Sequence, residues 1–406
     1  KFHLNDDIAR NGGSMLTLTE NNGFNGGNLF DWTKLDVDTS KLSGSRVIGK
    51  ATLLTGTTNG LKFSNYAGRN RTTAATNGDY ETALRTDTNT ETASKVILDY
   101  NLFQNNTNAT YDGSTSAITV PHSDGTSSSE IYGGISREGH TTTDNQLTVT
   151  GIHGTDDPKF AFGGLNEGAA GDVTNSHATI NLQNAADEIA EVYGGMIANE
   201  DNAGEVSGNS VAMQKGTVQK VFGGYTAGMG TVKNNTVNFS GSESSDHIAG
   251  GYIEKADSAA EAAENKVVFT NGTAVNVNGA VSEGTGALKK NTVTFSGNDS
   301  ETTTIRGAFS KNQGRVEENG VTISGGTVEN VYGAVTGGTG VAANNYVTLT
   351  GGTVDTEVAG GVGYQATGNT VTISGGTFSG YSGADVYGAK TTGGPGSSVS
   401  NNTVNL

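Results

Sequence analysis

The stretch Asn319-Gly-Val-Thr-Ile-Ser-Gly-Gly-Thr-Val-Glu-Asn-Val-Tyr-Gly-Ala334 contains the unit from which most of this chain is built. Its last four residues recur with the first glycines 26 to 31 residues apart. Such self-similarity at a fixed period predicts a solenoid, in which each repeat forms one coil. The other copies are Ile131-Tyr-Gly-Gly, Ala161-Phe-Gly-Gly, Val192-Tyr-Gly-Gly, Val221-Phe-Gly-Gly, Ile248-Ala-Gly-Gly, Val277-Asn-Gly-Ala, Ile305-Arg-Gly-Ala, Val358-Ala-Gly-Gly and Val386-Tyr-Gly-Ala.

An asparagine opens a short strand once in nearly every repeat. The strand that follows alternates, as in Val293-Thr-Phe295 and Val321-Thr-Ile323. Alternation of β-branched and polar residues indicates a strand, and stacked coils would bring the asparagine amides into hydrogen-bonding distance of one another. We therefore predict an asparagine ladder, broken only at Ala178, with the members Asn145, Asn209, Asn235, Asn265, Asn291, Asn319, Asn345, Asn369 and Asn402.

Glycine has two predicted roles in the repeat. Pairs such as Gly325-Gly326 and Gly351-Gly352 are expected at corners, where φ can be positive. The first glycine of the four-residue ending is never replaced, which indicates an interior position without room for a Cβ atom, or a backbone corner. The fold class expected is therefore an all-β, right-handed parallel β-helix of about ten regular coils.

The chain is expected to divide into an N-terminal cap with irregular coils, residues 1–115, and regular β-helix repeats, residues 116–406. The first part has β-rich texture without the period, and a cap would hide the first strand edge of the solenoid. Leu406 ends in mid-pattern, so the chain is interpreted as a fragment of something longer. The strand candidates of the first part are Leu16-Thr-Leu18, Val47-Ile48, Leu61-Lys-Phe63, Val96-Ile-Leu98 and Ile118-Thr-Val120.

Composition and motifs narrow the possible functions. The net charge of −17 argues against nucleic acid as a partner, and the absence of cysteine excludes disulfides and thiolate metal sites. No catalytic motif, zinc motif or phosphate-binding loop is present. We therefore predict no catalytic residue, no metal and no cofactor, and interpret the chain as not being an enzyme.

The position after the β-branched residue of the four-residue ending holds Arg306 in one copy. A charged side chain is not expected in a narrow apolar core, so this column should point outward. In four consecutive copies the column is aromatic, and exposed aromatic side chains usually mark a contact surface. The alternative is that a covering segment makes them ordinary packing. The predicted binding residues are Tyr132, Phe162, Tyr193 and Phe222.

The connections between repeats vary most in length and composition. Asn199–Glu205 and Glu254–Glu264 differ strongly, and the second is predicted to form a helical turn capped by Asp257. Variable loops on one edge of a regular scaffold often carry function, although tolerated insertions at exposed corners explain them equally well.

Asn369-Thr-Val-Thr-Ile-Ser-Gly-Gly-Thr, followed by Val386-Tyr-Gly-Ala, resembles the passenger repeats of large monomeric (type V) autotransporters of Gram-negative bacteria. The resemblance covers about residues 116–406. It implies a β-helix exported through an outer-membrane barrel and displayed outside the cell as an adhesin, a self-aggregation factor or a stalk. The barrel is missing from this sequence, and so is the Gly-Asp-Ser-Gly motif of protease passengers.

The function expected is therefore a non-enzymatic cell-surface adhesin or self-associating passenger. Its partners would be a host cell-surface protein or glycan, or a neighbouring cell, with membrane attachment only through the missing C-terminal barrel. The alternatives are a passive stalk and a β-helical carbohydrate-active enzyme. An ice-binding solenoid is the last option, but Gly320 and Tyr346 interrupt the array of outward threonines that it would need.

Overall fold

The computed structural model describes the strands of residues 2–104 and, beyond them, residues 105–114, 118–121, 127–137, 139–154, 158–184, 187–380 and 383–406. No helix occurs among these residues. The chain forms two compact units, Lys1–Gln104 and Asn105–Leu406. Val47, Ile48 and Leu61, from two of the predicted strands, lie outside the described residues.

The first unit is built from short strands in small sheets. A five-stranded sheet has the order β2-β5-β9-β8-β7, while β1 pairs with β4 and β3 pairs with β6. Strands β5, β9, β8 and β7 pair antiparallel, unlike the strands of a solenoid. The strands are β1 (Phe2–Asn5), β2 (Leu16–Leu18), β3 (Leu29–Phe30), β4 (Val37–Lys41), β5 (Gly49–Gly56), β6 (Lys62–Phe63), β7 (Arg69–Thr72), β8 (Thr82–Thr86), β9 (Lys95–Tyr100) and β10 (Phe103–Gln104).

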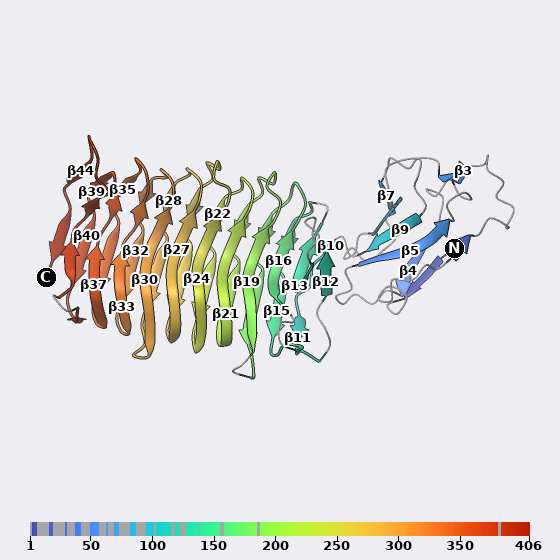
Figure 1. The fold of residues 1–406 in the computed structure, drawn as a ribbon, viewed down its shortest axis with the longest axis horizontal. Helices are drawn as coiled ribbons and strands as arrows, with labels where there is room; N and C mark the ends of the chain where they lie inside the picture. Colours follow the sequence, from blue (N-terminus) through green and yellow to red (C-terminus); the bar gives the residue numbers. More distant parts are fainter. Residues whose placement is uncertain are drawn as a thin grey trace. The chain divides into compact units, whose positions relative to one another are not determined.

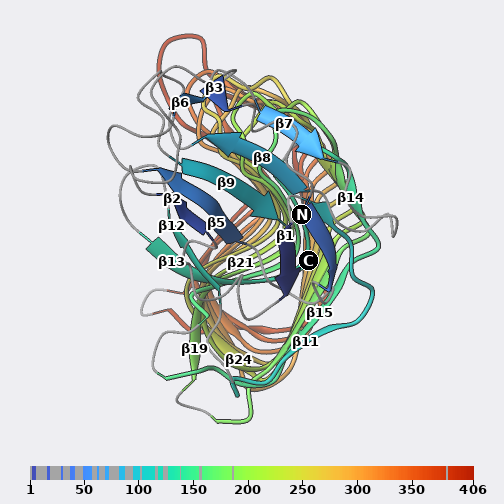
Figure 2. The same ribbon diagram turned by 90° about the vertical axis from the view of Figure 1, so that its right-hand side faces the viewer.

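The second unit is a parallel β-solenoid, as the repeat predicts (Figure 1). Each coil contributes a strand to three parallel sheets, named sheets 1, 2 and 3 in chain order from the asparagine. Sheet 3 has ten strands, so about nine full turns separate its first and last members. The coils superpose when viewed along the stack (Figure 2). The parallel pairing confirms the fold class, and the right-handed winding stays a prediction.

Sheet 1 contains the predicted alternating strands, with their valines, isoleucines, leucines and phenylalanines facing inward. Phe239, Phe269 and Phe295 stack inside the core with ring centroids 4.8 and 5.0 Å apart. The strands are β11 (Ala109–Tyr111), β15 (Gln146–Val149), β18 (His177–Asn181), the first part of β21 (Ser210–Thr226), β23 (Thr236–Phe239), β26 (Lys266–Phe269), β29 (Thr292–Phe295), β32 (Gly320–Ile323), β36 (Tyr346–Leu349), β40 (Thr370–Ile373) and β45 (Thr403–Asn405).

Sheet 2 contains the four-residue ending of the repeat. Its first strand, β13, also pairs antiparallel with β12. The strands are β12 (Ile118–Pro121), β13 (Ser127–Ser136), β16 (Phe160–Asn166), β19 (Glu188–Ile197), the second part of β21, β24 (Ser242–Ile253), β27 (Gly272–Ser282), β30 (Ser300–Ser310), β33 (Thr327–Tyr332), β34 (Val335–Thr336), β37 (Thr353–Ala359), β38 (Val362–Gly363), β41 (Thr377–Phe378), β42 (Asp385–Tyr387) and β43 (Lys390–Thr391).

Sheet 3 consists of short strands, each of which is separated by two residues from the following strand of sheet 1. Its inward side chains form a second apolar cluster, separate from the one between sheets 1 and 2. The strands are β14 (Thr142–Thr143), β17 (Val173–Thr174), β20 (Val206–Ser207), β22 (Val232–Lys233), β25 (Ala262–Ala263), β28 (Leu288–Lys289), β31 (Val316–Glu317), β35 (Val341–Ala343), β39 (Gln365–Thr367) and β44 (Ser398–Ser400).

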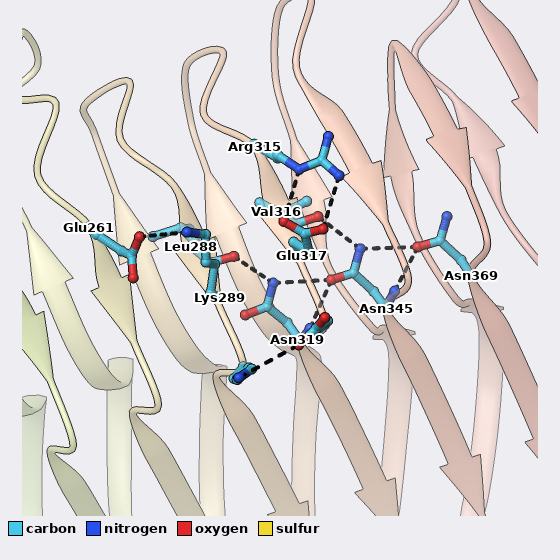
Figure 3. A network of polar contacts seen from close by, with 11 residues as sticks. Glu261, Leu288, Lys289, Arg315, Val316, Glu317, Asn319, Asn345 and Asn369 are labelled. Carbon is cyan, nitrogen blue, oxygen red and sulfur yellow. Dashed lines mark hydrogen bonds and ion pairs between the residues drawn. The ribbon is translucent and has the colours of Figure 1, made fainter.

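The asparagine ladder is present and runs along the corner between sheets 3 and 1 (Figure 3). Asn319 donates both its backbone N–H and its Nδ2 to Oδ1 of Asn345, each at 3.0 Å, and Nδ2 also donates to the carbonyl of Leu288 at 2.9 Å. The same pattern repeats from Asn209 to Asn402. Because the amides from Asn209 to Asn369 are fully buried, the ladder satisfies backbone groups that water cannot reach.

The break in the ladder lies at Ser176, so the prediction of Ala178 was wrong. Gln146 pairs with His177, which places Ser176 opposite Asn145 and leaves Ala178 in the core opposite Leu147. The Ser176 hydroxyl accepts from Nδ2 of Asn145 at 3.2 Å, and its backbone N–H donates to Asn209. A serine can replace one ladder contact because its oxygen is also an acceptor.

The residue before each ladder position has a positive φ, which the sequence analysis did not predict. Eight of these residues are not glycine, including Glu264 (57°), Lys290 (54°) and Glu318 (57°). Gly208 and Gly368 occupy the same place in two coils. At the other corners, Gly326, Gly352 and Gly376 have positive φ, as predicted for the glycine pairs.

The first glycine of the repeat ending has no room for a side chain, as predicted. A Cβ atom on Gly223 would lie 2.5 Å from the carbonyl oxygen of Gly250 and 3.1 Å from the backbone nitrogen of Thr236. Backbone atoms of both the next coil and the opposite sheet therefore close this position. Sheets 1 and 2 approach each other closely here, which separates the two apolar clusters.

Candidate functional site

The predicted aromatic column exists and lies on the outer side of sheet 2. The register places Tyr132, Phe162, Tyr193 and Phe222 next to one another in successive coils. Their rings stack with centroids 5.4, 5.1 and 5.2 Å apart. The prediction that these side chains share one column is therefore confirmed.

These aromatic side chains are buried, however, so the prediction of an exposed ridge was wrong. Their exposed fractions are 7, 5, 4 and 3 % in chain order. A second outward column, three residues further along each strand, packs against the first. Tyr225 of this column meets Tyr193 and Phe222 edge-on, with centroids 5.4 and 5.2 Å apart.

A bend at the glycine pair brings the two columns together. A Cβ atom on Gly194 would meet the backbone of Ser210, and one on Gly195 would meet the side chain of Asn209. Two successive positions thus face the interior, which interrupts the alternation of the strand. The outer face of sheet 2 is consequently concave, and the side chains before and after the glycines converge over it.

Beyond Phe222 the concave face opens into a groove. The first column continues through Ala249 and Asn278 to Arg306, and the second from Tyr252 through Val281 to Phe309. The short side chains in the middle leave a volume of about 510 Å³, within the range of small-ligand sites. The groove is lined by Glu191, Tyr193, Lys220, Phe222, Tyr225, Asp246, His247, Tyr252, Glu254, Asn276, Arg306, Phe309 and Lys311.

Two of the three cations around the groove form an ion pair with a carboxylate. Nζ of Lys220 lies 2.9 Å from Oε1 of Glu191, and Oε2 of the same carboxylate accepts a hydrogen bond from the hydroxyl of Tyr193. Lys311 forms an ion pair with Glu283, which accepts from the Tyr252 hydroxyl at 2.7 Å. Burial, followed by the nearby carboxylates, raises the pKa of Tyr193 and Tyr252.

Arg306 is different, because no carboxylate of the described residues forms an ion pair with it. Its Nη1 donates to Oδ1 of Asn276 at 3.4 Å and of Asn278 at 3.5 Å. The guanidinium also lies 4.8 Å from the ring centroid of Phe309 and 6.0 Å from that of Tyr332. Burial lowers the pKa of Arg306, although a guanidinium stays charged at any ordinary pH.

Two buried nitrogens beside Arg306 have no hydrogen-bond partner. They are Nδ2 of Asn278, which is fully buried, and Nε2 of His247. The contact of Oδ1 with Arg306 fixes the amide of Asn278, so its Nδ2 is a free donor. Burial and the positive charges of Arg306, Lys311 and Lys220 lower the pKa of His247 to about 4, which leaves its ring neutral at pH 7.

The two variable loops are held by hydrogen bonds, the first to a neighbouring coil and the second within the loop itself. Asn202, from the loop at 199–205, is fully buried and donates to the carbonyls of Gly168 and Ala170, both at 2.9 Å. The second loop contains a hydrogen-bonded turn between Lys255 and Ser258 instead of the predicted helical turn. A four-residue turn satisfies this corner without continuing into a helix.

In the part of the chain that the structure describes, no group of three or more histidine, aspartate or glutamate side chains is arranged to hold a metal ion. None of the described segments is a helix long and apolar enough to cross a membrane.

Comparison with known proteins gives no relative. No protein-family model, no curated protein and no solved structure matches this chain significantly.

The groove could be found from the sequence only in part. Arg306, Asn278 and Ala249 stand in the same column as the predicted aromatic residues, and this alignment was visible. The convergence of the second column was not visible in the sequence. Residues three apart lie on opposite faces of a regular strand, but the bend at the glycine pair brings them to the same face. Tyr225, Tyr252 and Phe309 were missed for that reason.

Proposed function

We propose that this chain is a non-enzymatic adhesin or self-associating passenger of the autotransporter type, displayed outside a Gram-negative cell. The groove on sheet 2 carries the proposal. It combines aromatic rings with the charged side chain of Arg306 and a buried nitrogen without a partner, Nε2 of His247, and buried polar groups normally have partners. A ligand that supplies those partners explains the arrangement, and the repeat resemblance and solenoid fold agree with surface display.

Binding is favoured over catalysis by how the carboxylates are engaged. Glu191 accepts hydrogen bonds from Lys220 and Tyr193, and Glu283 accepts from Lys311 and Tyr252. Carboxylates that hold the groove's own lysine and tyrosine side chains have a structural role, and neither is placed to transfer a proton to a substrate. The groove therefore has the character of a recognition site.

A passive stalk is the main competing function. It would have regular outer faces along all coils and no need for a groove confined to the coils between β19 and β30. A carbohydrate-active enzyme is the second, and would use Asp246 and Glu254, which line the groove and form no ion pair with the described residues. Both remain distinguishable by experiment.

The test is adhesion of beads coated with the full chain. We expect the beads to bind epithelial cells or to aggregate with one another, whereas beads carrying heat-unfolded chain at the same density should do neither. Equal behaviour of the two bead sets would support the stalk. Release of reducing ends from polysaccharides incubated with the purified chain would instead support the enzyme.

A further inference from the structure

We propose that the groove over β24, β27 and β30 binds a saccharide that carries a carboxylate, with Arg306 as the residue that recognises the acid. This inference rests on the proposed function and names the ligand class of that site. Its basis is the missing carboxylate partner of Arg306, the unpartnered ring nitrogen of His247 and the distribution of aromatic rings.

Arg306 differs from the two lysines of the groove in its charge environment. Lys220 and Lys311 are neutralised by glutamates, but Arg306 contacts only amide oxygens and rings. A guanidinium removed from water is costly without a counter-charge. In a chain of net charge −17, a partly buried cation without an acidic partner indicates that the partner arrives with the ligand. Arginine binds carboxylates in a bidentate manner, which adds orientation to attraction.

The hydrogen-bonding groups favour a ligand rich in hydroxyls. His247 brings a ring nitrogen without a partner, Asn276 an amide, and Asp246 and Glu254 acceptor oxygens. A hydroxyl both donates and accepts, so a sugar can satisfy such a mixed wall. An apolar ligand of the same size would leave the ring nitrogen of His247 without a partner.

The dimensions favour one or two sugar rings. Phe222 and Arg306 are three coils apart in one column, which corresponds to about 14 Å at the inter-strand spacing. Phe309 and Tyr252 belong to the second column, two coils apart, and are only partly buried. Their rings can pack against the apolar face of a sugar, while Arg306 holds the carboxylate beside Phe309.

The probes are two pairs that differ only in the acid: 3′-sialyllactose against lactose, and digalacturonate against its neutral disaccharide counterpart. Binding to the full chain is measured by calorimetry and by saturation-transfer NMR. We expect one acidic member to bind at least about tenfold more tightly than its neutral counterpart, the effect of one charge-assisted contact. The proposal would be overturned if the acidic and neutral members of both pairs bound equally, or if no probe bound at about 10 mM.

Variants locate the site. Arg306→Gln should abolish the preference for the acid, and Arg306→Lys should restore part of it. The matched control is Arg315→Gln, which removes an arginine paired with Glu317 on sheet 3. Thermal unfolding of each variant shows whether it is folded. If a variant does not fold, the comparison of acidic and neutral probes on the wild-type chain still tests the proposal. An unchanged preference in a folded Arg306→Gln chain would overturn the proposal.

The bead assay separates the two levels of the argument. Adhesion that continues undiminished with Arg306→Gln would refute the acidic-saccharide site and leave the adhesin function standing. Binding of the acidic probe without any adhesion or aggregation would refute the adhesin function and leave the site standing. A sulfated disaccharide that binds as tightly as its carboxylated counterpart would overturn the assignment to a carboxylate.

Discussion

Oδ1 of Asn345 accepts two hydrogen bonds from Asn319, one from the backbone N–H and one from Nδ2, both at 3.0 Å. The same relationship is repeated along the stack of coils, since Asn291 donates the same two hydrogen bonds to Asn319 at 2.9 Å. Each amide therefore fixes the backbone of the coil before it. The ladder acts as a hydrogen-bonded spine inside a corner that water does not reach.

Replacing Asn319 by alanine should destabilise the solenoid by about 1–3 kcal/mol or more, because buried donors and a carbonyl lose their partner. The measurement is chemical unfolding followed by circular dichroism. Asn271→Ala is the control, since Asn271 is exposed and off the ladder. Asn105 is unsuitable as a control, because its Oδ1 accepts from Asn145 and from the backbone of Thr143. Superimposable curves for the Asn319 and Asn271 variants would contradict a stabilising ladder.

Gly223→Ala should cost about 3 kcal/mol or more, because the added Cβ meets backbone atoms that cannot rotate away. Gly325→Ala is the control, since its Cβ would have its nearest neighbour at 3.1 Å and its φ is not positive. The control should cost under about 1 kcal/mol. Comparable losses of unfolding free energy would show that sheets 1 and 2 can separate at this point.

Glu264→Gly is expected to stabilise the chain by about 0.5–1 kcal/mol, because a non-glycine residue with positive φ is strained. Gly208 and Gly368 already fill this place in other coils. Glu264→Ala removes the same charge and keeps the strain, so it should bring no gain. If both variants melt at the same raised temperature, the charge and not the backbone is responsible.

Changing Tyr193 and Phe222 together to serine should destabilise the fold, since both rings are stacked and nearly fully buried. Truncation of a buried aromatic ring costs about 3–5 kcal/mol. Adhesion should then fall in proportion to the folded fraction, measured on the same preparation. A double variant that melts like the wild type but no longer adheres would return these residues to the role of an exposed binding ridge.

His247 should make the free energy of unfolding decrease at acidic pH. Its pKa is about 4 in the folded chain and about 6.5 when unfolded. Between these values the unfolded chain binds a proton that the folded chain does not, so stability is lost as pH falls from about 6.5 to about 4. The positive groups Lys220, Arg306 and Lys311 face the ring, together with the carboxylates Asp246 and Glu254.

The test of this dependence compares wild type with His247→Gln, which cannot gain the charge. The difference in unfolding free energy between the two should change by on the order of 2 kcal/mol from pH 7 to pH 4. Carboxylates titrate in both proteins and cancel in the difference. A difference that is constant with pH would show that the folded chain accommodates the imidazolium.

The period of the repeat ending was sufficient to predict the solenoid, because ten copies at nearly constant spacing allow no compact alternative. Asn319 and Gly223 were likewise predictable. A buried amide ladder requires asparagine in nearly every coil, with Ser176 in one coil as its substitute, and a position closed by backbone requires glycine. These are requirements on one residue type at one place, so they leave a visible column in the sequence.

Tertiary structure alone decided the groove. The sequence showed that Phe222 and Arg306 share an outward column, but the outward side became concave only where two glycines in succession face inward. That bend buries Phe222 against Tyr225, opens a space beside Ala249 and leaves Arg306 without a carboxylate partner among the described residues. Alternation along a strand determines the side on which a residue lies, whereas exposure depends on the curvature of that side and on neighbours three residues away.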